Sequence, residues 1–291
     1  MATAAVTRDL ARVARHLGAA PPVRLPPDPV PWIVRAAGVE PDPWQADVLR
    51  STAIRLLLLC ARQTGKSTCV GWLVAWRAAS RARQRVGLIA PTERQAKNLL
   101  AKVLETLMAA SPVPAIVQRT ATMLRLANGS TVLALPGDRP DTVRGLTLDL
   151  AAIDEAAFVK AELLRVLMPM LATTGGTLAM LSTPSGPIGP FYEAWQNAGD
   201  EWERVMIRAT ACPRITPEFL QSAQRRLGPA LFASEFDCEF LHGRGGLFDP
   251  SDLAAMFEAP SLPSGPHWAE QLALPSPGGA EGVTGAEGVL L

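Results

Sequence analysis

Cysteine and histidine are scarce in this sequence of 291 residues, which contains four of the former and three of the latter. No two cysteines form a C-x-x-C pair and no histidine lies near a second metal ligand, so the sequence offers no zinc site. Without a cysteine framework, the chain is typical of a protein kept in a reducing compartment. We therefore expect a cytoplasmic location.

Lysine is also rare, because only four of the 28 cationic residues are lysine and the rest are arginine. Arginine suits bidentate contacts with phosphate, although a genomic codon bias is the simpler explanation. The formal net charge is +1. The overall charge therefore carries no signature of nucleic acid or of an anionic membrane surface.

Long hydrophobic runs are absent as well. The longest uncharged run, residues 166–192, is interrupted by Pro169, Gly175, Gly176 and Pro184. A membrane-spanning helix needs about 20 predominantly apolar residues, so we expect none and predict no membrane partner. The N-terminus also lacks the apolar core of a secretion signal.

The two ends of the chain differ in composition from the middle. Residues 1–30 are a polar, proline-rich lead-in, and residues 260–291 contain five prolines and six glycines with few large apolar groups. Such a composition buries too little apolar surface to become ordered. We therefore expect a folded domain at residues 31–245, followed by a linker stub and disordered tail at 246–291.

Short apolar runs alternate with helical patterns between these ends. Strands are predicted at residues 55–61, 86–90, 131–136, 148–155, 177–183 and 204–209. A helix is predicted at 66–81 and another at 91–110, the second with Thr92 as its N-cap and Gln95 three residues later. This alternation predicts an α/β fold with a mainly parallel sheet and helices on both faces.

The stretch "LLLLCARQTGKST" contains most of a phosphate-binding loop. Gly65 lets the backbone approach the phosphates, Lys66 supplies charge for the β- and γ-phosphates, and Ser67 supplies a hydroxyl for Mg²⁺. Cys60 replaces the first glycine of the pattern but is small enough for the turn. The alternative is a chance G-K-S at a helix start. The predicted ATP contacts in this loop are Gln63, Thr64, Gly65, Lys66, Ser67 and Thr68.

A strand that ends in acid should supply the second half of such a site, and "LDLAAIDE" does so. Asp154 is predicted to hold the Mg²⁺ and Glu155 to orient and deprotonate the attacking water. We expect the loop and these acids to lie at the ends of adjacent strands. The alternative is a helix N-terminus that carries acidic residues.

Two further stretches gain meaning beside these motifs. "LSTPSG" ends a strand with Ser182 and Thr183, whose hydroxyls are placed to sense the γ-phosphate; the alternative is an ordinary turn. "PDPWQADVLR" precedes the first core strand. Gln45 is predicted to read the adenine edge, with Trp44 near the base, and core packing is the alternative for Trp44.

Together, "DPWQADVL", "ARQTGKST", "GLIAPTERQA", "VRGLTLDLAAIDEAAF" and "LSTPSGPIGPFYEAW" resemble the ATPase domain of the large terminase subunit, the DNA-packaging motor of tailed bacteriophages. The resemblance covers roughly residues 28–245. It implies a P-loop NTPase fold of the RecA-like, ASCE type. The family typically lacks the first loop glycine and carries a basic residue inside the loop. Arg62 is thereby implied to hold the phosphates or to switch with nucleotide state.

The resemblance also implies roles for individual residues. Lys66 and Ser67 match the Walker A positions, and Asp154 and Glu155 match the Walker B metal and catalytic positions. The coupling motif, which links hydrolysis to movement, corresponds to Ser182, Thr183 and Pro184. Arg144 matches an arginine proposed to act in trans on a neighbouring subunit's ATP, with Arg139 as a weaker competitor and a surface salt bridge as the alternative. The implied catalytic set is Glu155, Arg144 and Arg62.

The function implied is ATP- and Mg²⁺-dependent translocation of double-stranded DNA into a procapsid, in the cytoplasm of a bacterial host. The implied partners are the portal protein, the small terminase subunit and further copies in a ring. DNA contact would be to phosphate, and the arginines of residues 77–85 are candidates, with a solvated helix end as the alternative.

Large terminases usually continue into a nuclease domain, but only Asp249 and Asp252 remain as aspartates near the end of this sequence. We therefore expect no nuclease activity from it. The alternatives in function are a helicase-type DNA-dependent ATPase and a non-catalytic prophage relic that only binds nucleotide.

Overall fold

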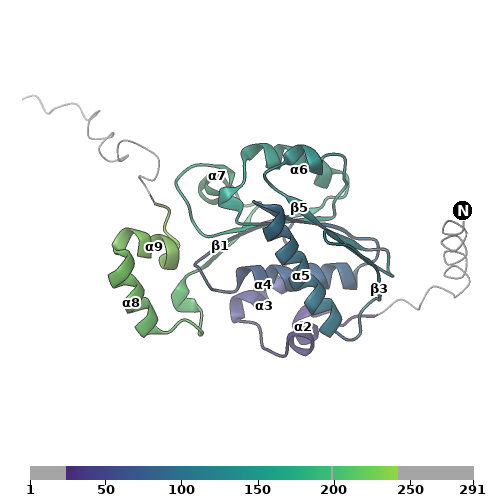
Figure 1. Cartoon of the computed structure of the whole chain (residues 1–291), viewed down its shortest axis with the longest axis horizontal. Coiled ribbons are helices and arrows are strands. Elements are labelled where there is room, and N and C mark those ends of the chain that lie inside the picture. Colours follow the sequence, from purple (N-terminus) through teal and green to yellow (C-terminus); the bar gives the residue numbers. More distant parts are fainter. Residues whose placement is uncertain (1–23, 198, 242–291) are drawn as a thin grey trace, which may run out of the picture. The chain divides into compact units, whose positions relative to one another are not determined.

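The computed structural model describes residues 24–197 and 199–241. Its centre is an eight-stranded sheet with the order β3-β4-β5-β2-β6-β7-β1-β8 (Figure 1). The strands are β1 Arg55–Cys60, β2 Arg85–Ala90, β3 Ile116–Arg119, β4 Met123–Leu126, β5 Thr131–Pro136, β6 Leu150–Asp154, β7 Thr177–Ser182 and β8 Glu203–Ile207. Six of them pair in parallel, and β3 and β4 form an antiparallel edge. The predicted fold class is confirmed.

The six strands predicted from the sequence are the six parallel strands. The β3–β4 hairpin was not predicted, because each of its strands is four residues long. β3 is also mostly exposed, so it lacks the apolar run that marked the other strands. The sequence signal of a short, half-polar edge strand is weak.

Helices cover both faces of the sheet. They are α2 Pro29–Ala37, α3 Pro43–Arg50, α4 Lys66–Ser80, α5 Glu93–Ala109, α6 Ala161–Ala172, α7 Pro190–Asn197, α8 Pro217–Leu227 and α9 Pro229–Asp237, with 3₁₀ turns η1 Pro140–Val143, η2 Ala156–Phe158 and η3 Ala209–Ala211. The predicted start of α5 is confirmed, since Thr92 Oγ1 accepts from the Gln95 amide at 3.3 Å and the Thr92 amide donates to Gln95 Oε1 at 3.2 Å.

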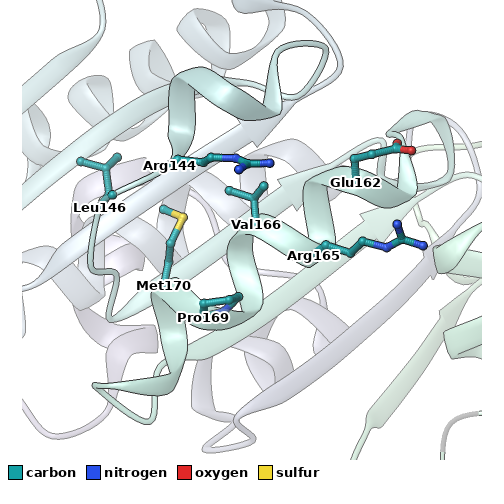
Figure 2. Close-up of a pocket in the computed structure, with 8 residues that line it drawn as sticks. Arg144, Leu146, Glu162, Arg165, Val166, Pro169 and Met170 are labelled. Atoms are coloured by element: carbon teal, nitrogen blue, oxygen red, sulfur yellow. The ribbon is translucent and has the colours of Figure 1, made fainter.

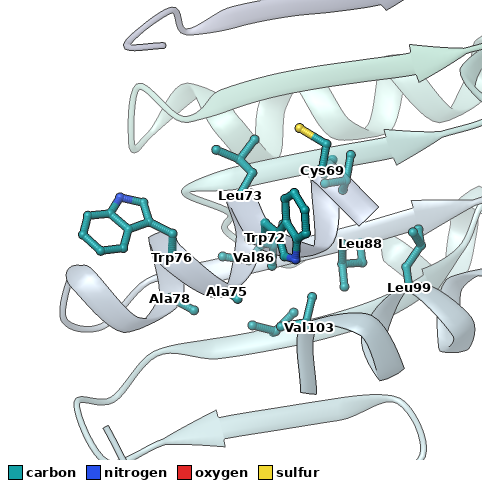
Figure 3. Packing of buried hydrophobic residues seen from close by; sticks show 14 of the residues in the cluster. Cys69, Trp72, Leu73, Ala75, Trp76, Ala78, Val86, Leu88, Leu99 and Val103 are labelled. Carbon is teal, nitrogen blue, oxygen red and sulfur yellow. The ribbon is translucent and has the colours of Figure 1, made fainter. Parts of the chain in front are cut away.

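Two hydrophobic clusters lie on opposite faces of the sheet. Along β1, Leu56 and Leu58 face the cluster formed with α2, α4 and α5, whereas Leu57 and Leu59 face the cluster formed with α6 and α7. This alternation explains why β1 reads as a continuous apolar run. Figure 3 shows the first cluster, where side chains of α4 and α5 pack together against β2. The phosphate loop therefore joins a fully buried strand to a largely buried helix.

The strand order corrects one prediction. The loop leaves β1 and the acids end β6, but these strands are not adjacent, because β7 lies between them. β7 pairs with both neighbours, with Ser182 opposite Leu59 and Leu181 opposite Asp154. Parallel strands end at one edge of the sheet, so all three carboxyl ends still meet there. Lateral order in a parallel sheet depends on the crossovers, which local sequence does not encode.

The predictions for the two ends fall mostly outside the described residues, which begin at Arg24 and end at Leu241. Within the expected lead-in, α2 begins at Pro29 and contributes the fully buried Trp32 and Ile33 to the core. Within the described part of the chain, every helix is too short or too polar to span a bilayer.

Candidate active site

The phosphate loop lies between β1 and α4. Gly65 is the N-cap of α4 and has a φ of 94°, in the left-handed region that favours glycine. Thr64 Oγ1 donates to the Ala61 carbonyl at 3.0 Å and closes the turn. Cys60, where the pattern has glycine, is fully buried against the first hydrophobic cluster, so its side chain leaves the loop unobstructed. The first amides of α4 are available to bind an anion.

The ends of the loop and of β6 come together as the sequence predicted. Lys66 Nζ lies 2.6 Å from Glu155 Oε1, and Ser67 Oγ donates to Asp154 Oδ2 at 2.7 Å. The side chains of Lys66 and Glu155 are 13% and 26% exposed, and Asp154 is 7% exposed. Cation, hydroxyl and two carboxylates therefore form one partly buried cluster.

Burial and strain both mark the acidic pair. Burial raises the pKa of Asp154, and the charge of Lys66 and the hydrogen bond from Ser67 oppose that rise. Glu155 has a φ of 52°, which is uncommon for a residue with a side chain. Its amide donates to Asp154 Oδ1 at 3.0 Å. Strained conformations of this kind concentrate at functional sites.

The predicted coupling residues lie beside this cluster. Ser182 is fully buried, and its Oγ lies 3.4 Å from Glu155 Oε2 while accepting from the Ala157 amide at 3.2 Å. Thr183 lines a cavity of about 280 Å³ together with Glu155 and Arg62. Because β7 lies between β1 and β6, Ser182 is held directly against the predicted catalytic carboxylate.

Arg62 is oriented toward α9. Its Nε donates to the Glu235 carboxylate, and its backbone amide donates to the Glu235 carbonyl at 2.9 Å. The side chain also lines the cavity that contains Glu155. The structure thus places Arg62 between the acidic pair and a helix more than 170 residues further along the chain.

A second cavity of about 260 Å³ also borders the acidic pair. Ser67, Asp154 and Glu155 line it, together with Gln95, Asn98 and Lys102 of α5. Lys102 Nζ lies 3.5 Å from Thr68 Oγ1. Lys102 was not predicted as a site residue, because the pattern of its helix indicated only a buried apolar face.

The donor set fits Mg²⁺ bound together with phosphate. The hydroxyl of Ser67 and the carboxylate of Asp154 are hard oxygen ligands. Across residues 24–197 and 199–241, no group of three or more His, Cys, Asp or Glu side chains is placed to hold a metal alone. Magnesium usually takes its remaining ligands from water and substrate phosphates, so this partial set is the kind expected of a nucleotide site.

Gln45 lies beneath the loop. It is 3% exposed, its Oε1 accepts from the Asp42 amide at 2.9 Å, and its Nε2 donates to the Gly65 carbonyl at 3.4 Å. Trp44 packs against the first hydrophobic cluster, and its buried indole N–H has no hydrogen-bond partner among the described residues. Adenine recognition by Gln45 stays a prediction.

An ion pair at the loop was not predicted from the sequence. Arg214, which precedes α8, donates from Nη1 to Asp42 Oδ1 at 2.8 Å and from Nη2 to Asp42 Oδ2 at 2.7 Å. Nη2 also lies 3.2 Å from the Thr64 carbonyl oxygen. The partners are 172 positions apart, so no local pattern could have identified them.

Arg144 lies away from this cluster. It lines a cavity of about 550 Å³ beside α6, with Glu162 and Arg165 at the same pocket and Leu146 and Val166 among its apolar residues (Figure 2). Arg139 is the N-cap residue of η1, shortly before it. The structure thus brings together most of the predicted site residues but not Arg144.

The arginines of residues 77–85 lie at the opposite edge of the sheet, because Arg85 begins β2. Arg77 Nη2 lies 3.4 Å from Thr177 Oγ1, and burial lowers the pKa of Arg77. Arg81, Arg83 and Arg85 are exposed. A role in DNA contact stays a prediction.

Comparison with known families gives one match that covers most of the chain. Residues 57–255 match the N-terminal region of the terminase large subunit, T4likevirus type. The large terminase subunits of Thermus phage G20c and Thermus virus P23-45 are each 30% identical over 175 residues. That alignment covers 54% of this chain and 36% of each relative, so the chain spans about a third of their length.

Solved structures show the same fold. The ATPase domain of the Thermus phage P74-26 large terminase superposes with a TM-score of 0.63 at 24% identity, covering 72% of this chain and 97% of that domain. A large terminase from a thermophilic bacteriophage, solved with ADP and with ATP-gamma-S, gives 0.58 at 14% identity and covers 69% of this chain. The superposition covers 54% of that terminase's chain in the ADP complex and 53% in the ATP-gamma-S complex.

Proposed function

Because the chain belongs to the family of large terminase subunits and matches their N-terminal region, we propose that its folded domain hydrolyses ATP with Mg²⁺ and couples hydrolysis to movement of double-stranded DNA. The observation that carries this proposal is the pairing of the loop with the acids. Lys66 contacts Glu155, and Ser67 contacts Asp154, at the carboxyl edge of a parallel sheet. The proposed domain spans residues 31–245.

Each of these residues has a defined role in the proposed reaction. The loop amides and Lys66 bind the β- and γ-phosphates, and Ser67 and Asp154 orient the metal. Bound Mg²⁺ supplies charge that stabilises the developing negative charge on the phosphate oxygens. The Glu155 carboxylate takes a proton from the water that attacks the γ-phosphorus, while the bond between that phosphorus and the leaving ADP oxygen breaks.

The Lys66–Glu155 contact indicates how nucleotide binding would release the catalytic base. In the structure the ammonium neutralises the carboxylate that must act as base. Phosphates in the loop compete for Lys66 and release Glu155 for the water, while Ser182 remains in contact with it. Arg62 and Glu235 form a further ion pair, which joins the loop to α9. The ADP and ATP-gamma-S complexes of the thermophilic phage terminase support nucleotide as the ligand.

The proposed partners follow from the family. They are double-stranded DNA bound through its phosphates, the portal protein, the small terminase subunit and further copies of this chain in a ring. Arginine contacts with phosphate release counterions, so DNA binding should weaken steeply as salt increases. We propose that this assembly works in the cytoplasm of the bacterial host.

Glu155→Gln is the direct test. The amide cannot accept the proton, so steady-state ATP turnover should fall at least about 100-fold, the range expected for general bases. Nucleotide affinity, measured by titration with a fluorescent ATP analogue, should remain within a few-fold of the original protein. Glu105→Gln, which alters an exposed carboxyl on α5, is the matched control and should retain turnover.

The family match favours a terminase over the helicase-type alternative. The relic alternative makes a different prediction for the unmodified protein. It would bind nucleotide but show no Mg²⁺-dependent release of phosphate, alone or with DNA. Turnover that survives Glu155→Gln would instead remove this residue from the proposed mechanism.

A further inference from the structure

We propose that Arg214 is a positioning residue of the nucleotide site. Held by Asp42, it turns the Thr64 carbonyl outward and so directs the Gly65 amide toward the phosphates. This inference rests on the proposed nucleotide-binding function and adds to it a residue from the segment before α8, outside every recognised loop motif.

Arg214 is held by a bidentate ion pair with Asp42. Both Nη atoms donate to the Asp42 carboxylate, at 2.8 and 2.7 Å, in the geometry that suits a guanidinium and a carboxylate. Asp42 is 7% exposed, is the N-cap residue of α3, and donates its amide to Gln45 Oε1. The hydrogen bonds to Asp42 raise the pKa of Arg214. The guanidinium is therefore held by a rigid, mostly buried platform, although its own side chain is 55% exposed.

The same guanidinium also holds the loop backbone through Nη2. In a trans peptide the carbonyl and the following N–H point in opposite directions. Arg214 Nη2 lies 3.2 Å from the Thr64 carbonyl oxygen, so the Gly65 N–H points away from Arg214. In the next peptide, the Gly65 carbonyl accepts from Gln45 Nε2 at 3.4 Å and from the Cys69 amide at 3.0 Å. The Lys66 N–H is therefore also directed away from this support.

The same two side chains pack against Gly65. A Cβ at this position would lie 3.0 Å from Gln45 Nε2 and 3.5 Å from Arg214 Nη2. Glycine is thus favoured chiefly for its φ of 94°, and a side chain here would press on Gln45 but meet Arg214 only at ordinary contact distance. Side-chain donors of Gln45 and Arg214 contact the loop carbonyls. The loop amides therefore point in the opposite direction, where together they form an anion site.

The charge of Arg214 is already matched by Asp42, so its main contribution is orientation. A loop that must first be ordered binds its ligand more weakly, because the ordering entropy is lost on binding. Removing the guanidinium should therefore weaken the binding of any polyphosphate. It should leave the chemical step unchanged, because Arg214 contacts neither Lys66 nor Glu155 in the described hydrogen bonds.

The test compares Arg214→Ala with the unmodified full chain. The Kd values for ADP and for inorganic triphosphate, measured by calorimetric titration with Mg²⁺, should both rise about tenfold, as expected for loss of one charge-assisted hydrogen bond. KM for ATP should rise by a similar factor, and kcat should stay within about twofold. Arg225→Ala, which removes an exposed arginine of α8, is the matched control and should change none of these values.

Three further variants separate positioning from general damage. Asp42→Asn should reproduce the loss, and the double variant should be little worse than either single one, because both act through one contact. Arg214→Lys retains the charge without the two-pronged geometry and should fall between. Hydrogen exchange at the Cys69 amide, which donates to the Gly65 carbonyl, should quicken in Arg214→Ala without nucleotide, while the amides of β1 stay protected.

The outcomes distinguish this inference from the proposed function. If the unmodified chain binds neither ADP nor triphosphate, the proposed function fails. If it binds both and Arg214→Ala binds them equally well, the positioning role is overturned while the proposed function stands. Weakened ADP binding with unchanged triphosphate binding would show that Arg214 contacts the nucleoside instead, and would also overturn the inference.

Discussion

Asp154 shows how the site requires residues that the fold alone would disfavour. The side chain is 7% exposed, and burial raises its pKa despite the nearby Lys66 charge. A carboxyl whose pKa is higher in the folded than in the unfolded chain stabilises the fold when protonated. That contribution is lost as the pH rises through the folded-state pKa. Ionisation of Asp154 in the folded chain therefore lowers the free energy of unfolding.

Asp154→Asn is accordingly expected to raise the melting temperature at pH 7 by roughly 1–3 °C, a change of the size expected for less than 1 kcal/mol in a domain of this length. The amide can still accept from Ser67 but no longer carries a buried charge. Calorimetry should record this gain, whereas the Mg²⁺-dependent part of nucleotide binding, measured with and without EDTA, should disappear.

Asp149→Asn is the matched control for this change, because Asp149 accepts from the Arg85 amide at the opposite edge of the sheet and its side chain is 22% exposed. It should leave nucleotide binding unchanged. A lower melting temperature for Asp154→Asn would mean that the attraction to Lys66 outweighs the cost of burial.

The residues of the site fall into two groups: those that a local sequence pattern predicts and those that only the tertiary structure reveals. Lys66 and Ser67 follow directly from the loop pattern, and the structure brings them to Glu155 and Asp154 as that pattern required. Arg214 could not be predicted, because its partner lies 172 positions away and arginine before a helix carries no distinctive signal. Local chemistry identifies the residues that touch a ligand, whereas the contacts that support them depend on the tertiary fold.

At the scale of elements, the predicted strands and the two long helices agree with the structure because each has a strong period and a clear boundary. The β3–β4 hairpin lacked that signal, and the insertion of β7 between β1 and β6 depends on crossovers rather than on local pattern. The insertion has a functional consequence. It places Ser182 at 3.4 Å from Glu155, which is the contact that the proposed coupling would use.

The start of α5 gives a test at this scale. Thr92 and Gln95 cap the helix, and Gln95 also lines both cavities that Glu155 lines. Thr92→Ala removes an N-cap and should cost about 1 kcal/mol of stability, which corresponds to about 2–4 °C in melting temperature. Thr92→Ser keeps the hydroxyl and should lose less than half as much. Equal losses in a thermal melt would assign the effect to the Thr92 methyl group rather than to the cap.

At the scale of the whole molecule, one predicted catalytic residue remains apart from the site. Arg144 lines a cavity with α6, whereas Lys66, Asp154 and Glu155 lie together at the end of the sheet. An arginine that stabilises charge in the transition state must reach the phosphates. In the proposed ring, Arg144 of a neighbouring copy of the chain would reach those phosphates. The separation is therefore consistent with action in trans, and mixing experiments can test it.

Arg144→Ala and Glu155→Gln should each lack turnover alone, since the first loses the arginine and the second the base. In mixed rings an intact Glu155 site can receive Arg144 from its Glu155→Gln neighbour. Phosphate release should therefore recover to about a quarter of the original rate in equimolar mixtures whose assembly is verified by light scattering, if subunits mix at random and each interface acts alone. Arg139→Ala is the matched control and should retain turnover unmixed. Assembled mixtures that stay inactive would assign Arg144 to a structural role within its own subunit.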